Sequence, residues 1–205
     1  MQKITLAFVV VGLLCSRAAQ AQTWELVQDE DGIKVWTREV KGGSILEIKA
    51  QTVIELPAKR IWDVICDVQK YIEFMPYIQD LRIVGTHENG IYLYQRIDPP
   101  LVSERDYALK VVIEPDEGRG VYKRSWSPAN DRAPEKNPDV VRVEINTGNW
   151  TITSMSPNST KVVYYLYTDP GGSLPAWMVN KANKTSVPSL LSAVTKRSHD
   201  PTWTR

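Results

Sequence analysis

Few side chains in this sequence have both the type and the spacing that catalysis or metal binding requires. The two histidines are His87, in a predicted hairpin turn, and His199, near the C-terminus, and neither has a catalytic or ligating partner at a telling spacing. The sequence contains no His/Cys cluster of metal-ligand type, no Gly-rich phosphate loop and no nucleophile elbow. We therefore expect no metal, no cofactor and no catalytic residue.

Arg105 is the charged residue whose surroundings most need an explanation. One face of the strand predicted at 103–114 carries alternate residues, namely Arg105, Tyr107, Leu109 and Val111. If that face is buried, the guanidinium needs a partner, and Asp106 points to the opposite face. Two partners remain open: the phosphate or carboxylate headgroup of a ligand, or a carboxylate of the protein in a structural ion pair.

Strands are the main elements that must position these residues. Alternation of apolar and polar residues predicts strands at 24–27, 33–40, 45–54, 78–86, 90–97, 103–114, 121–126, 140–145, 149–155 and 161–168. Turn sequences separate them, among them Asn89-Gly90 and Thr147-Gly148. A long run of strands with few helices predicts an α+β fold with an antiparallel sheet.

Two helices are expected beside the sheet. Apolar residues at a spacing of three and four, from Ile61 to Val68, predict a helix that opens at Pro57. A second helix runs from Pro175 to about residue 198, and Pro188 inside it should bend or split it. Each helix has an apolar stripe that the concave face of a curved sheet can bury.

The C-terminal helix carries small residues where a sealed core would place Leu or Ile. Ala182 and Ser186 lie four residues apart, with Val179 on roughly the same face and Asn183 beside them. Small side chains at these positions widen the gap between helix and sheet and favour a cavity. The same residues would also permit close packing.

Residues 1–21 have the pattern of a secretory signal. Lys3 supplies a positive charge, the apolar run 4–14 is too short to span a bilayer, and Ala19-Gln20-Ala21 is a small-x-small cleavage site. Cleavage leaves Cys66 as the one cysteine, so no intrachain disulfide is possible, which suits a bacterial periplasm. We expect a protein of residues 22–205 exported across the inner membrane of a Gram-negative bacterium. The alternative is an uncleaved N-terminus of a cytosolic protein.

The charge and the length narrow the classes of partner. The sequence has 25 Lys and Arg residues against 24 Asp and Glu residues. Such a balance argues against nucleic acid as a partner and against strong attraction to anionic lipid surfaces. The length predicts one domain after the leader, and we expect it to be a monomer.

Three motifs and the order of the elements follow one known pattern. The motifs are Asp169-Pro170-Gly171-Gly172-Ser173-Leu174-Pro175-Ala176-Trp177-Met178-Val179-Asn180 after a Tyr-rich strand, Ser103-Glu104-Arg105-Asp106-Tyr107 at the start of a strand, and Gly148-Asn149-Trp150. In these features residues 22–205 resemble START domains, the lipid-binding modules related to steroidogenic acute regulatory protein. The resemblance implies a helix-grip fold, in which a curved antiparallel β-sheet wraps around a long C-terminal helix.

The resemblance also implies a function. It implies a hydrophobic tunnel between the sheet and the C-terminal helix that holds one lipid molecule, whether phospholipid, fatty acid or sterol-like. The polar segment 127–139, with its three prolines, resembles the lid loop of the family and is the expected gate. Transfer of a lipid would require transient contact with a membrane.

Residues of the tunnel follow from the same resemblance. Ungapped counting from Arg105-Asp106 places the acidic and basic pair of sterol-binding members at Tyr92 and Val111, so a less polar cavity is expected here. Trp177 either flanks the opening or anchors the helix by packing. The expected ligand-binding residues are Tyr92, Tyr94, Arg105, Tyr107, Leu109, Val111, Trp126, Val179, Ala182, Asn183 and Ser186.

Two other functions remain open beside a non-enzymatic lipid-binding protein. One is a helix-grip enzyme of cyclase/aromatase type that acts on a hydrophobic substrate. It would need converging acid and base groups, for which the sequence offers Arg105 and tyrosines. The other is a protein-interaction module with a filled core.

Overall fold

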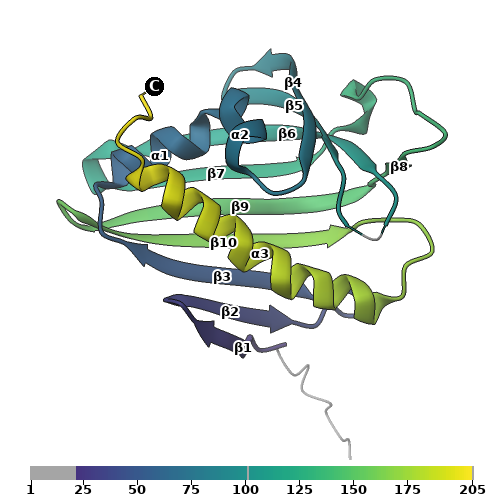
Figure 1. Cartoon of the computed structure of the whole chain (residues 1–205), viewed down its shortest axis with the longest axis horizontal. Coiled ribbons are helices and arrows are strands. Elements are labelled where there is room, and N and C mark those ends of the chain that lie inside the picture. Colours follow the sequence, from purple (N-terminus) through teal and green to yellow (C-terminus); the bar gives the residue numbers. More distant parts are fainter. Residues whose placement is uncertain (1–21, 101, 205) are drawn as a thin grey trace, which may run out of the picture.

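One curved sheet of ten strands forms the body of the described part of the chain. The computed structural model describes residues 22–100 and 102–204, so the predicted signal at 1–21 lies outside the described residues. The strands are β1 (Glu25–Glu30), β2 (Ile33–Arg38), β3 (Glu47–Ile54), β4 (Ile78–His87), β5 (Gly90–Ile97), β6 (Arg105–Asp116), β7 (Val121–Pro128), β8 (Val141–Arg142), β9 (Ile145–Ser156) and β10 (Ser159–Asp169). Their order is β1-β2-β3-β10-β9-β7-β6-β5-β4, and β8 forms a parallel pair with β6 (Figure 1).

The middle of the sheet joins segments that are far apart in the sequence. β10 pairs antiparallel with both β9 and β3, so that Tyr164 lies opposite Ala50 on one side and Trp150 on the other. Alternate residues of these strands face the concave side, and those of β3, Ile48, Ala50 and Ile54, are buried. The period of two in the sequence therefore fixes which face of each strand is inside, and the predicted α+β fold is confirmed.

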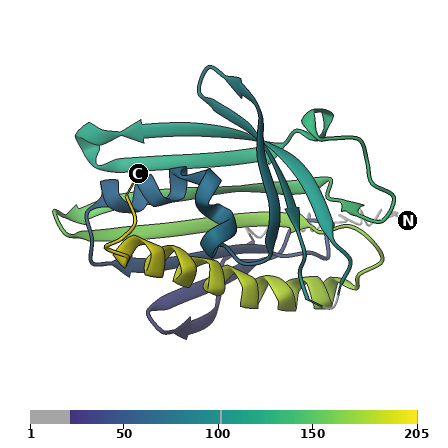
Figure 2. The same cartoon turned by 45° about the horizontal axis from the view of Figure 1, so that its top comes forward.

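Helices cover the concave face. α1 (Ala58–Cys66) and the one-turn α2 (Tyr71–Phe74) lie at one end, while α3 (Ala176–His199) runs along the sheet (Figures 1 and 2). α1 buries Ile61, Val64 and Ile65, as the spacing of three and four predicts. A sheet gripping one long helix is the helix-grip arrangement expected from the sequence. Among the described residues, no helix has the length and apolar character needed to cross a membrane.

Pro188 does not split α3, which was one of the two effects predicted for it. The helix is continuous from Ala176 to His199 with Pro188 inside it. Pro188 lacks the N–H of a normal helical hydrogen bond, but its neighbours Val187 and Leu191 are both buried in the core. Burial of this stripe offsets the missing bond and holds the helix together.

The predicted turn at Thr147-Gly148, and with it a separate strand at 140–145, is also wrong. β9 runs from Ile145–Ser156 through Gly148, and only the two residues of β8 pair before it. A Cβ atom at Gly148 would lie 2.3 Å from a ring carbon of Trp126 and 2.4 Å from the carbonyl oxygen of Tyr165. Gly148 is therefore a position of close approach inside a strand, where no side chain fits.

Candidate functional site

A cavity of about 680 Å³ lies between the concave face of the sheet and α3. Its walls are mainly apolar and aromatic, with polar groups at a few positions. The lining includes Leu93, Gln95 and Ile97 of β5, Arg105, Tyr107, Leu109 and Val111 of β6, Arg124 and Trp126 of β7, Asn146 and Trp150 of β9, Tyr164, Leu166 and Thr168 of β10, and Trp177, Met178, Val179, Ala182, Asn183, Ser186, Val187 and Leu190 of α3. This size and lining are those of a site for one small hydrophobic molecule.

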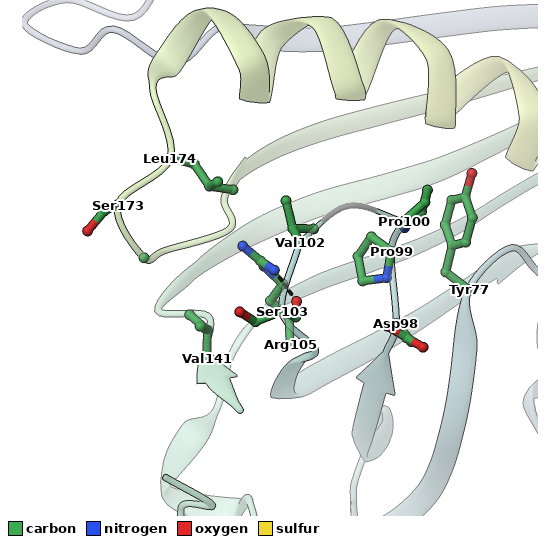
Figure 3. Close-up of a pocket in the computed structure, with 11 residues that line it drawn as sticks. Tyr77, Asp98, Pro99, Pro100, Val102, Ser103, Arg105, Val141, Ser173 and Leu174 are labelled. Carbon is green, nitrogen blue, oxygen red and sulfur yellow. Dashed lines mark hydrogen bonds between the residues drawn. The ribbon is translucent and has the colours of Figure 1, made fainter. Parts of the chain in front are cut away.

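An outer pocket of about 850 Å³ adjoins the cavity at one end. The two share Tyr77, Pro99, Pro100, Val102, Arg105 and Leu174 in their linings. Figure 3 shows Pro99, Pro100 and Val102 on one side of this boundary and Leu174 facing them from the other side. We call this shared boundary the mouth of the cavity, because it is where the inner space meets the open pocket.

Nine of the eleven expected residues line the cavity. They are Arg105, Tyr107, Leu109, Val111, Trp126, Val179, Ala182, Asn183 and Ser186. Alternation along β6 and β7 places the strand residues on the inner face, since neither pairing shows a bulge at these positions. The helical spacing places the residues of α3 on the side that faces the sheet.

Tyr92 and Tyr94 do not line the cavity, which corrects the prediction for these two residues. The pairing of β5 with β6 sets Leu93 opposite Leu109, and Tyr92 and Tyr94 opposite Lys110 and Ala108. Because directly opposite residues share a face, both tyrosines lie on the convex side of the sheet. Leu93 and Gln95 take the inner positions, so the count without gaps across the loop 98–104 was wrong by one residue.

Arg105 lies at the mouth and has no carboxylate partner among the described residues. Its side chain is 3% exposed, its Nη1 donates to the carbonyl oxygen of Ser103, and its Nε has no hydrogen-bond partner (Figure 3). Burial lowers the pKa of this guanidinium from its ordinary value. The structural ion pair considered for Arg105 is therefore not present in the described part of the chain.

Arg124 is a second buried cation on the cavity wall, which the sequence analysis missed. It is 4% exposed, and its Nη1 donates to the hydroxyl of Tyr71 at 2.7 Å and to the carbonyl oxygen of Ile65 at 3.3 Å. Burial raises the pKa of the Tyr71 hydroxyl, and the nearby charge of Arg124 opposes that rise. Arg124 and Trp126 are two residues apart on β7 and so lie on the same face of the strand. The prediction that Trp126 lines the cavity therefore implied the same for Arg124.

Aromatic side chains form the floor of the cavity. Trp126 lies in this floor rather than at the opening, and its Nε1 donates to Oδ1 of Asn146 at 2.9 Å. Tyr164 packs between Trp126 and Trp150, with ring centroids 5.6 and 4.6 Å away. Burial raises the pKa of Tyr107 to about 12 and also raises that of Tyr164. These hydroxyls are protonated at neutral pH and can only donate or accept hydrogen bonds there.

The opening is flanked by Trp177 of α3, which is 65% exposed. Packing as an anchor is therefore not its role in this structure. Met178 beside it and Tyr77 across the mouth are also exposed. Tyr77 has a backbone φ of 64°, in the left-handed region that few residues with a side chain adopt.

The segment 127–139, expected to be the gate, contributes no residue to the lining of the cavity. It is held on the convex side of the sheet. Arg142 donates two hydrogen bonds of 2.7 and 2.8 Å to the carboxylate of Asp106 and a third to the carbonyl oxygen of Pro134. The hydroxyl of Tyr94 donates to the same carboxylate. Arg132 lies over the ring of Tyr92, 4.9 Å from its centroid. On the convex side, Tyr92 therefore contacts this segment directly, and Tyr94 is linked to it through Asp106 and Arg142.

No group of His, Cys, Asp and Glu side chains among residues 22–100 and 102–204 could hold a metal ion. The charged residues on the cavity wall are basic, namely Arg105, Arg124 and Lys181. What the arrangement offers is an apolar volume with hydrogen-bond donors.

Comparisons with known proteins agree with this geometry. An uncharacterised protein of Pseudomonas aeruginosa, PA1579, is 28% identical over 87% of this chain and 90% of its own length. Phosphatidylcholine transfer protein of Bos taurus is 28% identical over 87% of this chain and 85% of its own length. The solved structure of a STAR-related lipid transfer protein fragment from Xanthomonas axonopodis superimposes with a TM-score of 0.78, at 24% identity, over 86% of this chain and 99% of that one.

A family model matches most of the described chain. It is described as polyketide cyclase / dehydrase and lipid transport, and it matches residues 54–195, from the last residue of β3 to the last turn of α3. This range contains α1, the strands that line the cavity and the helix that closes it. The chain therefore belongs to the polyketide cyclase / dehydrase and lipid transport family, with the helix-grip fold of START domains.

Proposed function

We propose that this protein binds one hydrophobic lipid molecule in the cavity beneath α3 and transfers it between membranes, without making or breaking a bond. The observation that carries the proposal is the cavity itself, about 680 Å³ with mainly apolar walls. Each methylene group of a lipid that leaves water for such a wall gains about 0.8 kcal/mol. Burial of the methylene groups of an acyl chain can therefore supply the free energy of binding.

The relatives support a lipid as the ligand. One of them is named a phosphatidylcholine transfer protein and another solved neighbour a lipid transfer protein. Both are similar over more than four fifths of this chain. From these relatives we infer the class of ligand, which is a lipid, but not its headgroup.

The family description also names cyclases and dehydrases, so an enzyme acting on a hydrophobic substrate is the second candidate. Such an enzyme needs a group that can accept a proton near neutral pH. Burial raises the pKa of Tyr107 to about 12, which makes its hydroxyl a poor base there, and the charged groups on the wall are arginines and a lysine. These observations favour binding over catalysis.

We assign the gate to the two segments that meet at the mouth. On one side, residues 98–100 and 102–103 contribute Pro99, Pro100 and Val102 to both the cavity and the outer pocket, and on the other side residues 170–174 contribute Leu174. Gly171 and Gly172 both have φ near 70°, a conformation that glycine adopts without strain. Opening here would admit a lipid, and the exposed Trp177, Met178 and Tyr77 would contact the membrane during transfer.

The cellular setting belongs to the same proposal. A leader pattern in residues 1–21 supports export and a periplasmic location. The balanced charge argues against a nucleic acid partner, and we propose that the protein is a monomer. N-terminal sequencing of the protein from fractionated cells would test the leader. A mature N-terminus at Gln22 in the periplasmic fraction is expected, and an intact N-terminus at Met1 in the cytoplasm would refute export.

Native mass spectrometry of protein purified without detergent tests the main proposal. We expect an added mass that is lost on solvent extraction and identified as one lipid per chain. The extracted protein should then take up lipid from vesicles and deliver it to acceptor vesicles. If the protein carries no lipid and takes up no phospholipid, fatty acid or sterol, the carrier function is wrong, and turnover of a polyketide-like substrate becomes the assay for the enzyme alternative.

A further inference from the structure

Three buried donor atoms on the cavity wall have no hydrogen-bond partner among the described residues. They are Nε of Arg105, Nε of Arg124 and Nδ2 of Asn183. Two other such atoms, on Arg197 and Ser198, lie outside the lining. A buried donor without an acceptor is costly, so native structures rarely keep one without a reason. The three residues that carry these donors line a space whose described lining contains no Asp or Glu.

The two arginines lie at opposite ends of the cavity. Arg105 begins β6 at the mouth, while Arg124 of β7 lies opposite Ile113, eight residues further along β6. At the rise of an extended strand, this separation is roughly 25 Å along the sheet. The bonds of Arg124 to Tyr71 and Ile65 fix it against α1 and α2, so it marks the inner end.

Deepening the proposed function, on which this inference rests, we propose that the cavity selects a lipid with an acidic headgroup and that Arg124 binds this headgroup at the inner end. The headgroup is a carboxylate or a phosphate, since either supplies the acceptor oxygens that the donors lack. The acyl chain then lies toward the mouth, along Val111, Leu109 and Tyr107. The lipid enters headgroup first.

Arg124 suits this role better than Arg105 because of its surroundings. Arg105 borders the outer pocket, where water reaches a bound anion and weakens the attraction. Arg124 is 4% exposed and lines only the inner cavity. In such surroundings a hydrogen bond between ions is stronger, and two of the donors of Arg124 are already held in place by Tyr71 and Ile65.

The test compares lipids that differ only in charge at the headgroup. Delipidated protein is titrated with oleic acid and with oleyl alcohol, and separately with dioleoyl phosphatidic acid and dioleoylglycerol, at neutral pH. We expect the acid of at least one pair to bind about tenfold or more tightly than its neutral partner. A preference in the first pair identifies a carboxylate, and one in the second a phosphate. Equal affinity within both pairs overturns the inference but leaves the carrier function standing. No binding of any of the four also overturns the inference, and the carrier function is then decided by native mass spectrometry and sterol uptake.

Variants then locate the headgroup. Arg124→Met should remove the preference while the neutral lipid still binds, and Arg124→Lys should keep part of it. Arg105→Met, the matched loss of a buried arginine at the mouth, should keep the preference. If Arg105→Met removes it and Arg124→Met does not, the headgroup binds at the mouth and our assignment is wrong. Circular dichroism of each variant verifies the fold, and the wild-type comparison does not depend on any variant.

Discussion

The two halves of α3 are built for different purposes, although they belong to one uninterrupted helix. From Val187 to the C-terminus, buried residues recur every three or four positions, at Leu191, Val194 and Ser198, and this half packs against α1. Between 176 and 186, Val179 is the one buried residue, and small and polar side chains face the cavity. We call these the sealed half and the open half.

The difference shows how one element can supply both stability and a binding site. In the sealed half, the buried side chains are enclosed by the core, and truncating one of them would leave a hole. In the open half, side chains already border a space, so their contacts are fewer. Stability and ligand binding should therefore respond to substitutions in different halves, and the following experiments test that division.

The largest expected difference is between two adjacent leucines. Leu191 is 1% exposed in the sealed core, whereas Leu190 lines the cavity. Leu191→Ala should lower the free energy of unfolding by about 2–5 kcal/mol, and Leu190→Ala by about 1 kcal/mol, because it enlarges a space that exists already. Urea denaturation of the delipidated protein measures both. Equal losses would show that the cavity wall at Leu190 is packed like the core.

Alkaline pH tests whether the cavity beneath the open half is dry. Burial raises the pKa of Tyr107 to about 12, against about 10 in an unfolded chain. The proton is therefore held more tightly in the folded state, so the stability it contributes is complete below pH 10 and is lost as the pH rises toward 12. At 1.36 kcal/mol for each pKa unit, the loss is on the order of 3 kcal/mol. Tyr107→Phe should remove that part of the pH dependence in urea titrations. An unchanged pH dependence would mean that water surrounds Tyr107.

Filling the space should have opposite effects on stability and binding. Ser186→Phe places a ring in the cavity, which should raise the free energy of unfolding by about 0.5–2 kcal/mol and abolish lipid uptake. Ser189→Phe is the control, since Ser189 is exposed and does not line the cavity. If Ser186→Phe instead lowers the free energy of unfolding by about 1–3 kcal/mol, as overpacking typically does, the cavity is smaller than described.

The smallest effect on stability is expected at the mouth. Trp177→Ala should change the free energy of unfolding by less than about 0.5 kcal/mol, because the side chain is mostly exposed. It should nevertheless slow the transfer of lipid from donor to acceptor vesicles, measured by fluorescence dequenching. Met155→Ala is the control, because Met155 is also exposed but lies at the other end of β9 from the mouth. Equal transfer rates in wild type and Trp177→Ala would remove Trp177 from the membrane contact.

Sequence periodicity predicted the fold well because backbone geometry enforces it. Alternate residues of a strand must face opposite sides, which located Arg105 to Val111 on the inner wall. The helical spacing of Val179, Ala182 and Ser186 did the same for α3. These predictions stayed within single elements, where the period alone decides.

Errors arose where two elements had to be related to each other. The register of β5 against β6 depends on the loop 98–104, so the sequence could not tell that Tyr92 faces outward. Gly148 was predicted as a turn because its contact with Trp126 comes from the neighbouring strand. Arg124 was not among the expected cavity residues, although its parity with Trp126 on the same strand indicated the inner face.

The pairing of β3 with β10 also bears on how the chain folds. It places residues 48–54 beside residues 160–166, so more than half of the chain lies in the loop that this pairing closes. Sheets dominated by such distant contacts fold in about milliseconds to seconds, far more slowly than helical domains of similar size. During synthesis, the first three strands emerge long before the strand that covers the edge of β3. A nascent chain that stops before Ser159 therefore exposes that edge, and it is a ready target for chaperones.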